Sequence, residues 1–85
     1  MINVYISEGC GYCEDLITKL KKNDLEFTKI NVDNVKNKTM VENLFKLVGE
    51  PVTPIIIIGK QVLAPKKSFN TIDQAISLIQ KITYL

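Results

Sequence analysis

Two cysteines stand close together near the N-terminus, in the segment SEGCGYCEDL that covers residues 7–16. Cys10 and Cys13 are the only cysteines of the chain, and Gly11 and Tyr12 separate them. One helical turn brings residue i+3 beneath residue i, which is close enough for a disulfide. The spacing therefore predicts a redox couple, in which Cys10 at the start of a helix is the nucleophile and Cys13, facing inward, is the resolving thiol.

The predicted position of Cys10 favours the charged form of its thiol. Helix N-termini present unpaired N–H groups and the positive end of the macrodipole, and in C-x-x-C sites the thiol pKa falls from about 8.5 to roughly 3.5–7.5. Gly11 adds little bulk beside the sulfur, and Tyr12 offers an aromatic face to a partner. We expect Cys10 and Cys13 to be the catalytic residues and Tyr12 to contact the substrate.

Three other uses of two cysteines compete with this interpretation. They could be unrelated core residues, although a strand-to-helix junction is an unusual place for such a pair. They could belong to a zinc site, but such a site takes four ligands. A chain without histidine would have to add carboxylates or a second chain. A purely structural disulfide would close a very short loop and constrain the unfolded chain little. We predict no metal site.

Length and composition limit the remaining functions. The 85 residues predict a single domain over 1–85, and the 46% hydrophobic content argues against disorder. The net charge of +2 and the lack of a basic stripe argue against a nucleic-acid partner. There is no basic, apolar leader at the start, and the longest apolar run, PIIIIG, is far too short to span a membrane. We expect a cytoplasmic monomer without membrane contact, in a compartment that keeps thiols reduced.

The elements that position the cysteines follow from hydrophobic spacing. Residues 2–6 (INVYI) predict a strand, and Gly9 and Gly11 interrupt it. From Cys13 onward, apolar residues recur at i, i+3, i+4 and i+7, so Cys13 is expected on the inward face of a helix that runs to about Lys22. Residues 27–32 alternate and predict a second strand. The first cysteine therefore belongs to a strand-to-helix loop.

The second half of the chain predicts two more strands and two more helices. A helix is expected from a capping box of Thr39 and Glu42 to Gly49, and another from a capping box of Thr71 and Gln74. Between them, TPIIIIG at 53–59 predicts a strand buried on both faces, and 61–64 predicts a short strand paired with it in a hairpin. The order β-α-β-α-β-β-α predicts an α/β fold with a four-stranded mixed sheet flanked by three helices.

The motif CGYC after an N-terminal strand, with VTPIIIIG at residues 52–59, resembles the thioredoxin superfamily, and most closely glutaredoxins and the short NrdH-type redoxins. The resemblance covers nearly the whole chain and implies a thioredoxin-like fold of glutaredoxin size. It also implies that Pro54 is a cis proline facing the cysteines. The backbone of Thr53 would then pair with a bound substrate as an added strand.

The resemblance further implies a dithiol–disulfide oxidoreductase of the cytoplasm without a tightly bound cofactor. Its substrates would be disulfide-containing proteins, ribonucleotide reductase among them. Glutathione or a thioredoxin reductase would be the electron source. The alternative is a glutathione-dependent carrier of a 2Fe–2S cluster, because some glutaredoxins with a small residue at the position of Gly11 bridge such a cluster. A binding subunit without redox chemistry is disfavoured by the intact C-x-x-C.

The chain departs from the family pattern around the expected glutathione pocket. Ser7 stands where glutaredoxins often carry a basic residue, Ala64-Pro65 where they have two glycines, and Lys67-Ser68 where a Thr-Asp type pair follows. The segment LAPKKSF also lacks the aromatic WSGF-like run of NrdH-type proteins. Acidic side chains surround the cysteines, namely Glu8, Glu14 and Asp15. We expect these acids to repel anionic glutathione and to disfavour the Cys10 thiolate.

Overall fold

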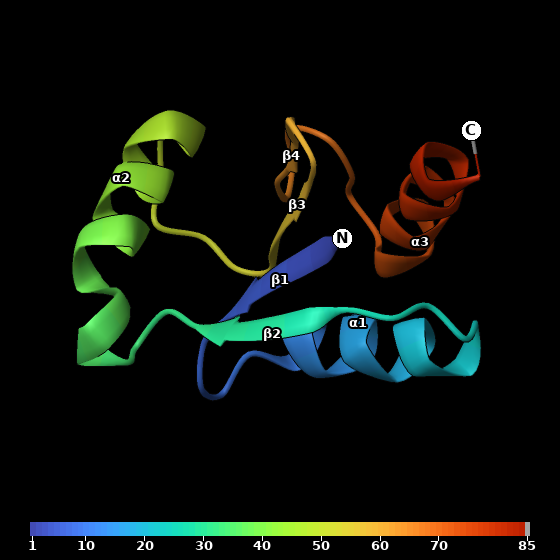
Figure 1. Cartoon of the computed structure of the whole chain (residues 1–85), viewed down its shortest axis with the longest axis horizontal. Helices are drawn as coiled ribbons and strands as arrows, with labels where there is room; N and C mark the ends of the chain where they lie inside the picture. The colour runs from blue at the N-terminus through green and yellow to red at the C-terminus, as the bar shows by residue number, and fades with distance from the viewer. Residues whose placement is uncertain (85) are drawn as a thin grey trace.

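Four strands form one mixed sheet in the computed structural model, which describes residues 1–84 (Figure 1). The strands are β1 (Ile2–Ile6), β2 (Thr28–Asn31), β3 (Ile55–Ile58) and β4 (Gln61–Leu63), in the spatial order β2-β1-β3-β4. β1 pairs parallel with β2 and antiparallel with β3, and β3 pairs antiparallel with β4. The predicted parallel start and antiparallel closing hairpin are confirmed.

Helices cover both faces of this sheet. α1 (Gly11–Lys22) and α3 (Ile72–Thr83) lie on one side, and α2 (Lys38–Val48) lies on the other, after a short 3₁₀ turn η1 (Val35–Asn37) (Figure 1). The three-helix, four-strand architecture is the one that the sequence predicts. None of the helices within residues 1–84 is long and apolar enough to cross a membrane.

The position of β3 inside the sheet explains why its sequence is apolar at every residue. Ile56 and Ile58 pack into the core under α1 and α3, whereas Ile55 packs on the opposite face against α2. Because both faces of the strand are covered, neither alternate set of side chains has to be polar. The core below α1 and α3 contains the fully buried Val4, Leu16, Leu20, Ile56 and Ile79.

The predicted start of α1 is confirmed, and the predicted start of α2 is wrong. α1 begins at Gly11 with Cys10 as its N-cap, so the predicted place of Cys10 at the start of this helix is confirmed. The predicted capping box of Thr39 and Glu42 is wrong. The chain enters α2 through η1, so Thr39 already lies inside the helix, and Asn37 at the N-cap makes no side-chain cap bond.

The other predicted helix boundaries are confirmed. Thr71 and Gln74 form a complete capping box at the start of α3. Gly49 ends α2 in the left-handed conformation, with φ of 99°. Lys67 adds to this end of the helix, because its Nζ donates a hydrogen bond to the carbonyl of Val48.

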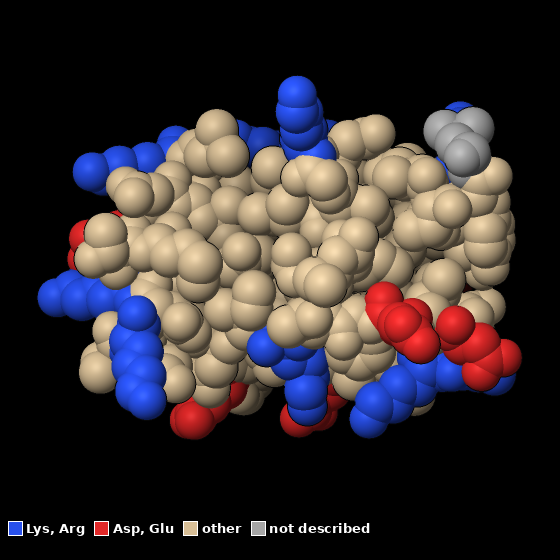
Figure 2. Space-filling model, in the orientation of Figure 1, with Lys and Arg blue, Asp and Glu red and all other residues tan. Residues whose placement is uncertain are grey.

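An exposed ion pair joins the two helices that share a face. Lys19 Nζ of α1 lies 2.7 Å from Asp73 Oδ1 of α3 and 3.5 Å from Asp15 Oδ2. The hydrogen bond to Asp73 and the charges of both carboxylates raise the pKa of Lys19. Elsewhere on the face drawn in Figure 2, lysine side chains project from separate places at the periphery and leave an uncharged middle. The described residues on that face form no basic stripe of the kind that binds nucleic acid.

Candidate redox site

The sulfur of Cys10 caps the first helix. Cys10 is the N-cap residue of α1, with an extended backbone, and its Sγ accepts a hydrogen bond from the backbone N–H of Cys13 at 3.1 Å. This is the bond that a serine or aspartate oxygen ordinarily makes at an N-cap. The positive end of the helix dipole therefore lies beside the sulfur.

The two cysteines form a disulfide with Cα atoms 5.2 Å apart, which is within the ordinary range for such bonds. Cys13 is only 2% exposed, whereas Cys10 is half-buried. A reductant or a substrate can therefore reach the sulfur of Cys10 more readily than that of Cys13. The predicted inward orientation of Cys13 agrees with its burial.

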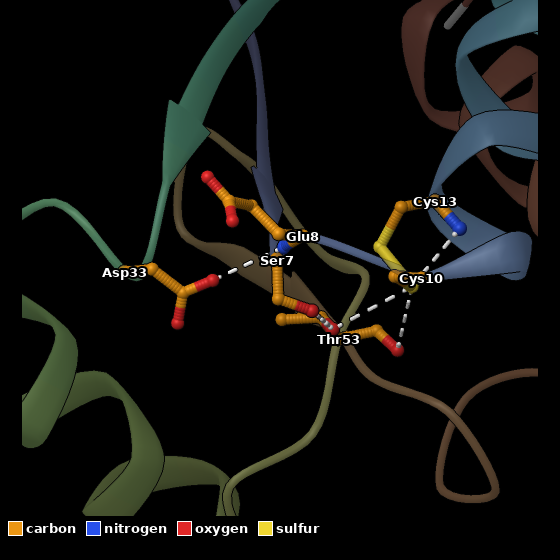
Figure 3. Close-up of a disulfide and its surroundings, with 6 residues drawn as sticks. All are labelled: Ser7, Glu8, Cys10, Cys13, Asp33 and Thr53. Atoms are coloured by element: carbon orange, nitrogen blue, oxygen red, sulfur yellow. Dashed lines mark hydrogen bonds between the residues drawn. A yellow bond between two sulfur atoms is a disulfide. The ribbon is translucent and has the colours of Figure 1, made fainter.

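The loop before β3 supplies the other wall of the site. The Thr53–Pro54 peptide bond is cis, as the resemblance implied, and Pro54 is buried. Thr53 Oγ1 lies 3.6 Å from Cys10 Sγ, and the Thr53 carbonyl oxygen lies 3.9 Å from the same sulfur (Figure 3). Thr53 and Pro54 thus lie 43 or more residues from Cys10 in sequence but beside it in space.

A second contact of Thr53 was not expected from the sequence. Ser7 Oγ lies 2.6 Å from Thr53 Oγ1, so the two hydroxyls share a hydrogen bond directly behind Cys10 (Figure 3). In the sequence Ser7 stood out only because a basic residue was missing there. The partner of its side chain depends on the pairing of β1 with β3, which local spacing does not specify.

Two carboxylates, those of Glu8 and Asp33, lie at the start of the cysteine loop. The backbone N–H of Glu8 donates to Asp33 Oδ2 at 3.1 Å, and both acidic side chains lie beyond Ser7, on the side away from the disulfide (Figure 3). Glu14 and Asp15 are exposed in the first turns of α1. Asp33 adds a carboxylate to the acidic surroundings predicted from Glu8, Glu14 and Asp15.

Tyr12 lies on the surface next to the cis proline. Its side chain is 64% exposed. It borders a small, mostly apolar hollow lined by Tyr12, Pro54, Pro65, Phe69, Asn70 and Ile72. An aromatic ring at this position can contact a substrate that approaches Cys10.

The loop after β4 is closed by its own hydrogen bonds. The backbone N–H groups of Ala64, Lys66 and Ser68 donate, in that order, to Ser68 Oγ, the Phe69 carbonyl and the Ala64 carbonyl, at 2.7–3.1 Å. Pro65 has no N–H to donate. This loop therefore offers a ligand few free backbone donors, although it occupies the position of the expected glutathione pocket.

The family model for glutaredoxin matches residues 2–63, which include all four strands and the cysteine motif. This chain belongs to the glutaredoxin family. Glutaredoxins are thiol–disulfide oxidoreductases, and the Cys10–Cys13 pair provides the redox-capable couple of this glutaredoxin.

Solved structures agree on the thioredoxin-like fold. The thioredoxin-like protein BC3987 is 23% identical with a TM-score of 0.67, and the match covers 96% of this glutaredoxin and 99% of that protein. Glutaredoxin from Archaeoglobus fulgidus is 20% identical with a TM-score of 0.72, over 93% and 85% of the two chains. NrdH-redoxin from Escherichia coli is 22% identical with a TM-score of 0.62, over 74% and 79%. A search with the sequence finds no match among curated proteins.

Proposed function

We propose that this glutaredoxin reduces protein disulfides through Cys10 as nucleophile and Cys13 as resolving thiol. The observation that carries the proposal is the N-cap position of the Cys10 sulfur, where the Cys13 N–H and the Thr53 hydroxyl can both stabilise a thiolate. In the first step the Cys10 thiolate attacks one sulfur of the substrate disulfide. A mixed disulfide forms, and the other substrate sulfur leaves as a thiolate, which takes up from solvent the proton that Cys10 had released.

In the second step the buried thiol of Cys13 resolves the mixed disulfide. Cys13 loses its proton and attacks Cys10 Sγ, and the substrate sulfur leaves with the electron pair and takes up a proton. The substrate has then gained two electrons and two protons, and the Cys10–Cys13 disulfide has formed. Thr53 and Pro54 hold the substrate chain beside Cys10, and Tyr12 contacts it from α1. The partial exposure of Cys10 and the burial of Cys13 support this division of roles.

We further propose that a flavin-dependent dithiol reductase of the thioredoxin reductase class, rather than glutathione, reduces the disulfide again. Glutathione carries carboxylates that need donors, yet the N–H groups of the loop after β4 are largely engaged within it. Lys67 is bound to the end of α2, and its cation would not suit an ammonium group. Glu8 and Asp33 add negative charge at the start of the cysteine loop. The structurally similar NrdH-redoxin is described as glutaredoxin-like with a thioredoxin-like activity profile.

The test is to measure turnover of the oxidised protein with two electron sources in parallel. One is NADPH with thioredoxin reductase, and the other is glutathione with glutathione reductase. We expect turnover with thioredoxin reductase and at least tenfold slower turnover with glutathione. Efficient turnover with glutathione alone would contradict the proposed reductant. Ribonucleotide reductase is the first protein substrate to supply in the same assay.

The purified protein can also be used to test the alternative function, a glutathione-dependent carrier of a 2Fe–2S cluster. A carrier would need Cys10 and glutathione as ligands. The N–H groups of the loop after β4 are largely engaged within that loop, so the glutathione ligand of such a cluster would find few backbone donors there. We therefore expect colourless protein after anaerobic reconstitution with iron, sulfide and glutathione. A brown, dimeric product with iron bound would favour the carrier.

A further inference from the structure

Two hydroxyl groups stand in series behind the reactive sulfur. Ser7 Oγ lies 2.6 Å from Thr53 Oγ1, and Thr53 Oγ1 lies 3.6 Å from Cys10 Sγ (Figure 3). Ser7 directly follows β1, and Thr53 precedes β3 by two residues, so the pairing of these strands fixes the contact. Both side chains are half-buried, which reduces competition from water.

The direction of these hydrogen bonds depends on the state of Cys10. Each hydroxyl has one proton to donate, and either oxygen of the Ser7–Thr53 pair can be the donor. A disulfide sulfur is a weak acceptor, so in the oxidised protein Thr53 loses little by donating to Ser7. A thiolate is a charged acceptor, and hydrogen bonds to charged groups are about twice as strong as neutral ones. Thr53 then donates to the sulfur, and Ser7 donates to Thr53.

We propose that Ser7 is a positioning residue for the redox reaction, which acts through Thr53 to stabilise the Cys10 thiolate. The Ser7 hydroxyl turns the Thr53 proton toward the sulfur and polarises the Thr53 hydroxyl, because hydrogen bonds in a chain strengthen one another. We call the hydroxyls of Ser7 and Thr53 the hydroxyl relay. This uncharged relay takes the place of the basic residue that glutaredoxins often carry at the position of Ser7. The inference rests on the proposed function, since it assumes that Cys10 is the reacting cysteine.

The charged groups near Cys10 do not replace this relay. On the segments around the sulfur the titratable groups are Glu8 in the cysteine loop, Tyr12, Cys13, Glu14 and Asp15 in α1, Asp33 after β2, and Lys66 and Lys67 in the loop after β4. The carboxylates oppose a thiolate. All of these groups remain when Ser7 alone is changed, so a comparison of Ser7 variants isolates the hydroxyl chain.

The relay acts at two points of the redox cycle. Cys10 is a thiolate when it attacks the substrate disulfide, and it leaves as a thiolate when the reductant breaks the last bond to its sulfur. Stabilising that thiolate favours the dithiol form over the disulfide and makes the couple more oxidising. Loss of the Ser7 hydroxyl should therefore slow attack by Cys10 at low pH and make the couple more reducing.

The experiment measures alkylation of the reduced protein by iodoacetamide across a range of pH, with mass spectrometry to count label on Cys10 alone. Ser7→Ala should move the rate profile to higher pH. Below the midpoint we expect alkylation about three- to tenfold slower, the effect of losing one hydrogen bond. The plateau at high pH should be unchanged or slightly higher, because the nucleophilicity of a thiolate rises with the pKa of its thiol. Ser7→Thr, which keeps a hydroxyl, should restore the profile.

A second pair of variants separates the relay from a merely structural bond. In a Thr53→Val background, Ser7→Ala should have no further effect, because the link to the sulfur is already lost. An unchanged profile for Ser7→Ala, or equal effects of Ser7→Ala with and without Thr53, would overturn the relay. Cys10→Ser serves as the control for the proposed function. If it keeps turnover, the assignment of the nucleophile fails, whereas a failed relay alone leaves Cys10→Ser inactive.

Discussion

Cys10 stands at an N-cap, where serine, threonine, aspartate and asparagine are usual because a side-chain oxygen accepts one of the free N–H groups. Here a sulfur accepts that bond from the Cys13 N–H. One interaction therefore caps the helix and stabilises the charge that the reaction needs. The bond should strengthen when Cys10 becomes a thiolate, since a full charge is a better acceptor.

The backbone conformation at the end of α2 favours glycine, which is Gly49. Gly49 has φ of 99°, and a Cβ built there would lie 2.9 Å from Lys67 Nζ. We expect Gly49→Ala to lower the free energy of unfolding by about 1 kcal/mol, because a side chain is strained in the left-handed region. Urea unfolding of the oxidised protein measures this change.

The matched control is Gly11→Ala. Gly11 is a helical residue of α1, and a Cβ there would meet no atom within 4 Å. Alanine is preferred over glycine inside a helix, so this variant should be as stable as the parent or slightly more stable. Equal destabilisation by both substitutions would contradict the account of Gly49.

At the scale of elements, the start of α3 is fixed by a capping box. The Thr71 hydroxyl accepts the Gln74 N–H at 3.1 Å, and Gln74 Oε1 accepts the N–H of Thr71. We expect Thr71→Ala to cost about 0.5–2 kcal/mol of stability, measured by urea unfolding.

Thr39 provides the comparison for this prediction. It looked like a capping residue in the sequence, but it lies inside α2, which has no side-chain cap bond. Thr39→Ala should therefore leave stability nearly unchanged or raise it slightly, since alanine is the better helix former. A loss as large as that of Thr71→Ala would mean that Thr39 does cap the helix.

These two threonines show what the sequence can predict about elements. Apolar spacing identified each strand and helix, and the local motif at Thr71 was sufficient to predict the start of α3. The start of α2 was missed because η1 carries no buried residue and hence no apolar period. The start of α1 could be predicted, because the C-x-x-C motif at the strand-to-helix junction placed Cys10 there, and Cys10 is its N-cap.

At the scale of the whole molecule, the sheet assembles the site from distant segments. The antiparallel pairing of β1 with β3 brings Thr53 against Cys10 and places Ser7 within hydrogen-bond distance of Thr53. The cysteine pair could be predicted from its own spacing, and the place of Pro54 from family resemblance. The Ser7–Thr53 bond and the closed loop after β4 could not, because both depend on three-dimensional pairing.

The most direct test of the central claim is to trap the mixed disulfide. Cys13→Ala keeps the buried position apolar, and Cys10→Ser keeps a hydroxyl at the N-cap, so both variants should fold. Each variant is incubated with a disulfide substrate, and the adduct is mapped by mass spectrometry. We predict that Cys13→Ala accumulates a mixed disulfide on Cys10 and that Cys10→Ser forms none and does not turn over. An adduct on Cys13, or turnover by Cys10→Ser, would contradict the account.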